Sequence, residues 1–284
     1  MAHDRLSPLD SSFLHIEDDV SHMHIGAICT FEGPAPSYDE LLARMAGKLD
    51  LLPRFRQVVR QVPGDLGRPV WVDYGGFTLE YHVRHTALPS PGGDAALARL
   101  VGRVMSQQLD RGRPLWEMWM VEGLADGRWA LISKTHHCMV DGVSGADMLA
   151  VVLDADRDAP VAPPAPWSPR PAPSPALLTA EALLQRAVSP VEQLRTLRAV
   201  TRAPRRALAD GAQVARTLWA AAGVLGRPSP PTSLNGPLGP HRRWGTADAT
   251  VEEVKAIRRG LGGTFNDVVL AAVTRGYRDL LVAR

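Results

Sequence analysis

The pattern of apolar and polar residues in the first part of the chain predicts strands and helices in alternation. A run of strand-forming residues from His24 to Phe31 ends at Gly33-Pro34 and predicts a strand. Apolar residues then recur at helical spacing after Ser37, with Glu40 in the spacing of a capping box, which predicts a helix that ends by Pro53. Further strands are predicted over 70–72, 77–83, 116–122 and 129–135, a hairpin turn at 125–128, and helices over 94–109 and about 142–153. Strands mixed with helices of this length predict an α/β fold.

The pattern changes after the first 158 residues. Between Pro160 and Pro175, half of the 16 residues are proline, which predicts an extended, semi-rigid segment. Residues 176–227 then show a helical, arginine-rich pattern that is typical either of a solvated helical face or of a helix on an anionic membrane surface. A Pro/Gly-rich loop over 228–240 precedes a short helix over 251–259 and a buried helix over 266–281.

These changes predict three regions: an α/β region over 1–158, a proline-rich linker with a basic amphipathic helical crossover over 159–240, and a final region over 241–284.

Composition and charge exclude several classes of protein. The 284 residues are 45% hydrophobic and 22% charged, as in ordinary globular domains, and the net charge of +2 argues against a nucleic-acid partner. The two cysteines make neither a disulfide framework nor a metal quartet. The sequence contains neither an apolar signal core nor a stretch approaching the roughly 18 to 20 apolar residues of a bilayer span. We therefore expect a cytoplasmic protein that is at most peripheral to a membrane.

The candidate chemistry lies in one segment, where His136, His137, Asp141 and Gly142 form the pattern HHxxxDG. An apolar strand leads into the two histidines, so their imidazoles lie at a strand end that can face a cleft. A neutral imidazole can take a proton from a hydroxyl or amine as that group attacks a carbonyl carbon. Asp141 begins the following helix, where a carboxylate accepts backbone N–H groups and therefore fixes local structure.

Three other interpretations of this segment are weaker. A metal site would need His136, His137 and Asp141, but adjacent histidines in an extended strand point to opposite faces, and no further ligand set is evident. The two histidines could also be purely structural. Cys138 could be a nucleophile, but no separate base is evident for it, which favours a small core residue.

The segment KTHHCMVDGVSGADML resembles the active-site motif of the bacterial wax ester synthase/diacylglycerol acyltransferase family, within the coenzyme A-dependent acyltransferases. Further segments are similar to blocks of that family in the same order along the chain: LSPLDSSFLHIED, MHIGAICTFEG, RPLWEMWMVEGL, SLNGPLGPHRRW and TFNDVVLAAV. The resemblance implies a chloramphenicol acetyltransferase-like α/β fold, in which a mixed sheet is flanked by helices.

The resemblance also implies a reaction and its residues. His137 would act as general base on a long-chain alcohol or on the hydroxyl of diacylglycerol, which then attacks acyl-CoA directly, while Asp141 would be structural. Acyl-CoA would be a substrate, with no bound cofactor, and the protein would contact a membrane or lipid-droplet surface. The block Pro114-Leu115-Trp116 would belong to the acyl-binding region, and Asn266-Asp267 to the neighbourhood of the active site.

Both of these blocks also have structural explanations. Trp116 could be an ordinary core aromatic at a strand end, and Asn266 could serve only as the N-cap of the last helix.

The resemblance further implies two similar halves with the active site between them, and on that basis the chain contains the N-terminal half and the start of the second. We therefore expect Val268, Val269 and Val273 of the last helix to lack a packing surface, which predicts self-association or a need for the rest of the second half. Two alternative functions remain open: a non-catalytic lipid- or partner-binding half, and a condensation-type enzyme that uses carrier-bound acyl groups.

Overall fold

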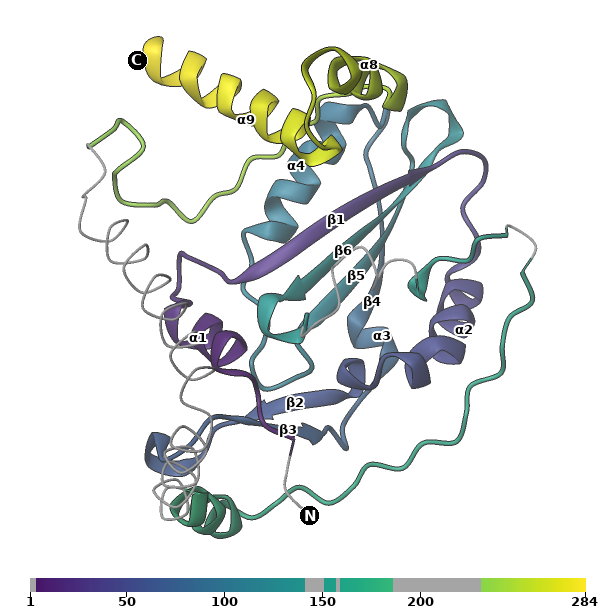
Figure 1. Cartoon of the computed structure of the whole chain (residues 1–284). Helices are drawn as coiled ribbons and strands as arrows, with labels where there is room; N and C mark the ends of the chain where they lie inside the picture. The colour runs from purple at the N-terminus through teal and green to yellow at the C-terminus, as the bar shows by residue number, and fades with distance from the viewer. Residues whose placement is uncertain (1–3, 141–150, 157–158, 186–230) are drawn as a thin grey trace. The chain divides into compact units, whose positions relative to one another are not determined.

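The computed structural model describes residues 4–140, 151–156, 159–185 and 231–284 (Figure 1). The chain divides into two compact units. Unit 1 comprises Met1–Pro190 and Gly239–Trp244, and unit 2 comprises Val191–Leu238 and Gly245–Arg284.

A four-stranded mixed sheet forms the centre of unit 1. Its strands lie in the order β1 (His24–Phe31), β6 (Trp129–His136), β5 (Trp116–Glu122) and β4 (Val83–Ala87). β6 pairs antiparallel with both β1 and β5, whereas β4 and β5 are parallel. A smaller antiparallel sheet contains β2 (Gln57–Arg60) and β3 (Val70–Asp73). The strands predicted over 24–31, 70–72, 116–122 and 129–135 are confirmed.

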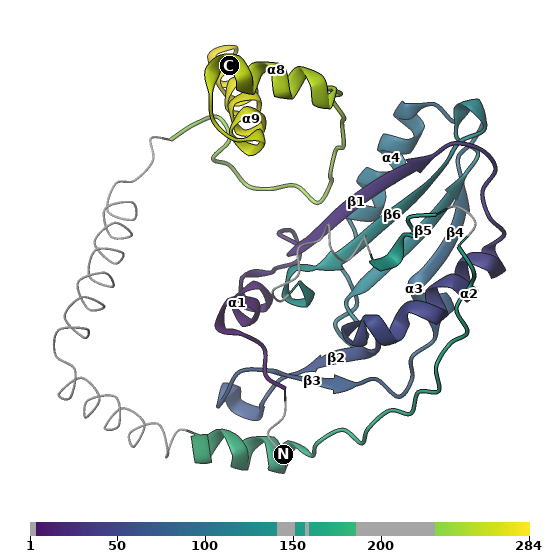
Figure 2. The same cartoon turned by 45° about the vertical axis from the view of Figure 1, so that its right-hand side comes forward.

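Helices cover both faces of the main sheet (Figure 2). On one face, Val101 and Val104 of α4 (Asp94–Met105) pack with Val121 and Ile132 of the sheet. On the other face, α1 (Pro8–Ile16) and α2 (Tyr38–Lys48) pack on the neighbouring sheet residues, among them Met118 and Leu131. Because strand side chains alternate between faces, consecutive residues of β5 and β6 serve two separate cores. The predicted fold class, an α/β mixed sheet flanked by helices, is confirmed.

The first helices begin and end for identifiable reasons. The Ser37 hydroxyl accepts the N–H of Glu40 at 3.2 Å, so α2 starts at the predicted cap. It ends at Lys48 and continues into the short turns η1 (Leu49–Leu51) and η2 (Pro53–Arg56). Helix α4 ends at Met105, four residues before the predicted end. The buried Lys134 ammonium donates to the carbonyls of Val104 and Gln107 there, which satisfies groups at the helix end.

The strand predicted over 77–83 is wrong. One helical turn, α3 (Leu79–His82), occupies most of this segment, and β4 begins only at Val83. The turn places His82 inside the core, where its Nδ1 lies 2.8 Å from the carbonyl oxygen of Trp116. An alternating apolar pattern over so few residues cannot distinguish a strand from a turn that buries one side.

The proline-rich segment is extended, as its composition predicts. Residues 159–174 contain no regular secondary structure, and residues 175–185 are helical, with Leu178 and Ala182 packed on the smaller sheet. The short turns η3 (Pro63–Asp65) and η4 (Ala125–Gly127) complete the unit. Most residues of the helices predicted over 142–153 and 176–227 lie outside the part of the chain that the structure describes.

The described part of unit 2 contains two helices, α8 (Val251–Leu261) and α9 (Phe265–Val282). Thr250 and Thr264 each form a capping box with an acidic residue three positions on, which defines both starts. The interpretation of the last helix as buried is wrong, because no residue of α9 is buried. Val269 and Val273 are 43% and 50% exposed, as expected for apolar positions without a packing surface. None of the described helices has the length and apolar character that a bilayer span requires.

Candidate active site

The two motif histidines lie where β6 ends and the short turn η5 (His137–Met139) begins. The backbone N–H of His136 donates to the carbonyl of Leu115 at 2.9 Å, next to the first residue of β5. The N–H of His137 donates to the carbonyl of Met23 at 2.8 Å, just before β1. Strands on either side therefore fix the backbone of the pair.

The imidazole of His136 is completely buried and its orientation is determined by the backbone. Its Nδ1 accepts the N–H of Cys138 at 3.1 Å, so a neutral ring carries its proton on Nε2. Nε2 lies 3.5 Å from Oε2 of Glu17. Burial lowers the pKa of His136 below its usual value, while Glu17 opposes this shift. The His136 ring is thus held neutral and fixed, as a structural support would be.

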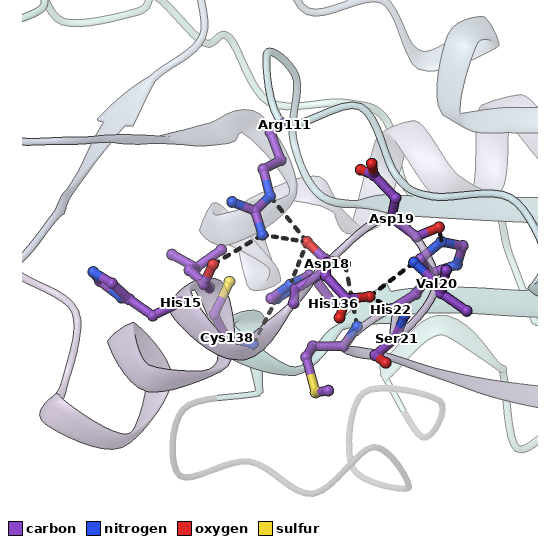
Figure 3. A network of polar contacts seen from close by, with 12 residues as sticks. His15, Asp18, Asp19, Val20, Ser21, His22, Arg111, His136 and Cys138 are labelled. Carbon is purple, nitrogen blue, oxygen red and sulfur yellow. Dashed lines mark hydrogen bonds and ion pairs between the residues drawn. The ribbon is translucent and has the colours of Figure 1, made fainter. Parts of the chain in front are cut away.

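Glu17 is the buried anion of the site, with a side chain that is 1% exposed. Its Oε2 accepts two hydrogen bonds from Arg111, at 2.9 and 2.6 Å, and its Oε1 accepts the N–H of Met23 at 3.1 Å. Burial alone would raise the pKa of Glu17, but the Arg111 hydrogen bonds, the charge of His136 and the Met23 N–H together lower it below 4.5. Figure 3 shows Arg111 and His136 converging on the same network, with Cys138 beside the ring.

His137 differs from its neighbour in accessibility. Its ring is only partly buried and stacks on Phe13 of α1, with centroids 4.7 Å apart and planes at 25°. Within the described residues, neither ring nitrogen of His137 takes part in a hydrogen bond, in contrast to Nδ1 of His136. Of the two imidazoles, that of His137 is therefore the one that solvent or a bound molecule can reach.

Cys138 is fully buried, and burial raises the pKa of its thiol to about 12. At neutral pH this sulfur stays protonated and is not nucleophilic, which agrees with its interpretation as a small core residue. Among the residues that the structure describes, no group of three or more His, Cys, Asp or Glu side chains could hold a metal ion. Asp141 and Gly142 lie outside the described residues.

The block Pro114-Leu115-Trp116 lies in the core directly beside the histidines. Trp116 is 1% exposed, and its indole N–H donates to the carbonyl of Phe55 at 2.9 Å. The rings of Phe55 and His82 stack on it, with centroids at 4.3 and 4.7 Å. The structural explanation therefore accounts for Trp116, and contact of this block with an acyl chain stays a prediction.

Asn266 and Asp267 belong to unit 2. The prediction of Asn266 as N-cap is wrong, because Thr264 occupies that position and its hydroxyl accepts the N–H of Asp267. The carboxylate of Asp267 accepts the N–H and hydroxyl of Thr264 in return, at 2.7 and 2.8 Å. The N–H and hydroxyl hydrogen bonds from Thr264 lower the pKa of Asp267. This reciprocal cap explains Asp267 structurally, while a role of either residue near the active site stays a prediction.

Sequence reasoning missed Glu17, Arg111 and Phe13, which surround the histidines. Phe13 and Glu17 both lie inside the segment LSPLDSSFLHIED, which carries the family resemblance but contains no pattern that indicates a chemical role for either residue. Arg111 stands in a polar turn among other charged residues and has no distinguishing sequence pattern.

The buried His82 and the partly buried His24 predict how stability depends on pH. Burial lowers the pKa of His82 and of His24 to about 4, from a usual value of 6.5. Between these values the unfolded chain binds protons that the folded chain does not, so the free energy of unfolding should fall as the pH drops from 6.5 to 4. Each group contributes at most about 1.4 kcal/mol per pH unit.

Urea unfolding between pH 4 and 7 measures this slope. His82→Asn removes one titrating group and keeps an N–H for the carbonyl of Trp116, so the slope should become shallower. An identical slope in the variant would contradict the assignment of His82.

Comparison with known proteins decides the family. A model of the wax ester synthase/diacylglycerol acyltransferase catalytic domain matches residues 6–269. The chain belongs to the wax ester synthase/diacylglycerol acyltransferase family. A solved wax ester synthase/diacylglycerol acyltransferase from Marinobacter aquaeolei VT8 is similar, with a TM-score of 0.61 and 28% identity, over 98% of this chain and 61% of that one.

Two relatives from the same family come from Mycobacterium tuberculosis H37Rv. The probable diacylglycerol O-acyltransferase tgs1 is 38% identical over 284 residues, which cover 98% of this chain and 58% of the relative. The probable diacylglycerol O-acyltransferase tgs3 is 35% identical over 260 residues, covering 89% of this chain and 95% of the relative. The chain thus spans somewhat more than half the length of tgs1 and nearly the whole of tgs3.

Proposed function

We propose that this chain supplies the histidine-bearing part of an O-acyltransferase that moves a long-chain acyl group from coenzyme A to diacylglycerol or a long-chain alcohol. The observation that carries the proposal is the contrast between the two imidazoles. His136 is buried and bonded to the backbone, whereas His137 is partly exposed with its ring nitrogens unpaired in the described part of the chain. Family membership supplies the class of substrate.

The proposed reaction begins with His137 as general base. Its imidazole takes the proton of the acceptor hydroxyl while the hydroxyl oxygen attacks the thioester carbonyl carbon. The resulting oxyanion collapses, the carbon–sulfur bond breaks, and the thiolate of coenzyme A leaves and takes the proton from the imidazolium. The products are an ester and free coenzyme A, and His137 returns to its neutral form.

The neighbours of His137 orient it. Stacking on Phe13 restricts rotation of the ring, and the backbone bond to Met23 fixes the start of η5. The buried Glu17 carboxylate, itself held by Arg111, supports His136 from the other side. Glu17 and Arg111 are positioning residues in this proposal, and Asp141 has the structural role that the family motif implies.

The transfer is direct, without an acyl-enzyme. The buried Cys138, a protonated thiol at neutral pH, supports this part of the proposal.

Release of free thiol from palmitoyl-CoA, with and without 1-hexadecanol or dipalmitoylglycerol, tests the proposed activity. We expect release that depends on the acceptor, together with formation of wax ester or triacylglycerol. Release that is independent of the acceptor would indicate hydrolysis. A folded chain that binds lipid but releases no thiol would instead support the non-catalytic alternative.

Association with a lipid surface and self-association are part of the same proposal. The acceptor molecules reside in membranes or lipid droplets, and α9 presents apolar side chains that are exposed within the described structure, among them Leu270 and Val273. Pelleting with anionic vesicles at low salt and analytical ultracentrifugation test the two parts. A protein that does not pellet with the vesicles would contradict association with a lipid surface. A protein that stays monomeric at high concentration would contradict self-association.

A further inference from the structure

Unit 1 contains an open, positively charged groove of about 530 Å³ between α4 and the segment Gly239–Trp244. Arg99 and Arg103 line it from the helix, and Arg243 lines it from the segment. No acidic residue is among its lining residues. The proposed catalytic residues do not line this groove.

Close backbone packing holds the two walls together. A Cβ on Gly102 would lie 2.5 Å from the carbonyl oxygen of Arg242, so only glycine allows this approach. The hydroxyl of Ser106, the C-cap residue of α4, accepts the backbone N–H of Arg242 at 2.9 Å. The Arg242 guanidinium donates to the carbonyl of Gly239 at 2.9 Å and also to the carbonyl of Val20. Arg242 is therefore occupied in fixing the segment.

The other three arginines are available to a ligand. Arg99 and Arg103 are exposed and one helical turn apart, so their like charges repel each other. Neither they nor the exposed Arg243 form an ion pair or side-chain hydrogen bond within the described residues. Three guanidinium groups that have no acidic partner in the described residues can bind phosphate oxygens, because the planar guanidinium donates paired, charge-assisted hydrogen bonds to them.

An aromatic side chain completes the groove. Trp244 lines it at the end of the segment and is 38% exposed, so part of its side chain is accessible to a ligand. Indole faces stack well on nucleobases, and base stacking does not depend on a particular base edge. Arginines beside an open indole therefore fit a phosphorylated nucleoside better than an isolated phosphate ion.

The groove is connected to the candidate active site through two contacts. The Arg242 guanidinium binds the carbonyl of Val20, three residues after Glu17. The ring of His24, which pairs with His136 across β1 and β6, lies 3.0 Å from the carbonyl of Met105, next to Ser106 of the groove. A ligand in the groove therefore lies beside the elements that hold the two motif histidines.

We propose that this groove binds the phosphorylated adenosine end of coenzyme A, with Arg99, Arg103 and Arg243 on the phosphates and Trp244 on the adenine. This assignment rests on the proposed function for the identity of the ligand. The groove itself also predicts a simpler property, which is binding of adenosine 3′,5′-bisphosphate, a molecule that carries no acyl group and undergoes no reaction.

Calorimetric titration of the chain with adenosine 3′,5′-bisphosphate, coenzyme A and adenosine tests the assignment. Arg99→Gln and Arg103→Gln should each weaken binding of the two phosphorylated ligands about fivefold, as expected for an exposed charge pair. Trp244→Leu should weaken binding of all three ligands. Arg60→Gln, which removes the same charge from an exposed position on β2, should change nothing.

Gly102→Ala tests the geometry without changing the charge. Alanine favours the helix, but its Cβ displaces the segment that carries Arg243 and Trp244. Binding of the bisphosphate should therefore weaken while circular dichroism shows an intact fold.

The outcomes separate this inference from the proposed activity. Equal binding in the wild type and all groove variants, or no binding to the wild type, would overturn the groove assignment even if the chain shows acyltransferase turnover. Groove-dependent binding without turnover would support the adenosine phosphate site and contradict the proposed activity. If the arginine variants lose affinity for vesicles with anionic phospholipid but keep it for coenzyme A, the groove contacts lipid phosphates and the assignment is wrong.

Discussion

Replacing His137 with alanine should lower acceptor-dependent thiol release from palmitoyl-CoA by about 100- to 10,000-fold, the contribution of a positioned general base. The ring of His137 is the partly exposed one of the pair, and its removal leaves the acceptor hydroxyl protonated as it approaches the thioester. Because the proton transfer occurs in the transition state, the loss should appear in kcat, with KM for the thioester nearly unchanged.

The control for this variant is His15→Ala. His15 is an exposed histidine on α1, the helix that also carries Phe13, so its removal changes composition equally without touching the proposed base. Near-UV circular dichroism of the His137 variant checks that loss of the stacked ring leaves the core intact. Full activity of a folded His137→Ala protein would eliminate His137 as the base.

Arg111→Met should destabilise the fold by about 3–5 kcal/mol, because it leaves the buried carboxylate of Glu17 without its cation. Glu17→Gln should cost less, since it removes the buried charge itself and leaves Arg111, which is 42% exposed, able to reach water. The double variant should then be more stable than Arg111→Met alone, because the uncompensated charge is gone.

Urea unfolding of the three variants at pH 7 provides the comparison. The pKa of Glu17 lies below 4.5 in the folded chain, so the contribution of the pair is present above that pH and is lost as the pH falls below it. The stability gap between the wild type and Glu17→Gln should therefore narrow in acid. A double variant as unstable as the sum of the single variants would contradict the coupling.

Most of the strands of unit 1 could be predicted from the sequence, because their apolar residues form short runs or alternate with polar residues along the chain. In β5 and β6, consecutive apolar residues serve the two covered faces, and a turn separates the strands in the sequence itself. The segment over 77–83 failed because its alternation also fits a single helical turn that buries His82. The apolar pattern of α9 indicated burial, but a helical period shows which face is apolar and not what covers it.

The candidate site could be predicted only in its local part. The two histidines are adjacent in the chain and stand at the end of a recognisable strand. Their support comes from Glu17 and Arg111, which lie 94 residues apart and meet only in the folded chain. An ion pair between residues so far apart produces no periodic pattern in the sequence, because each of the two residues is only one charged residue among several.

The pairing of β1 with β6 determines when the main sheet can form during synthesis of the chain. The paired residues run from Phe31 with Trp129 to His24 with His136, so the first strand of the sheet has no partner until the ribosome has added about a hundred further residues. Pairings so distant in sequence form late in folding. The histidines stand at the far end of this last strand, and the nascent chain therefore completes its histidine pair only after every other strand of the sheet has emerged.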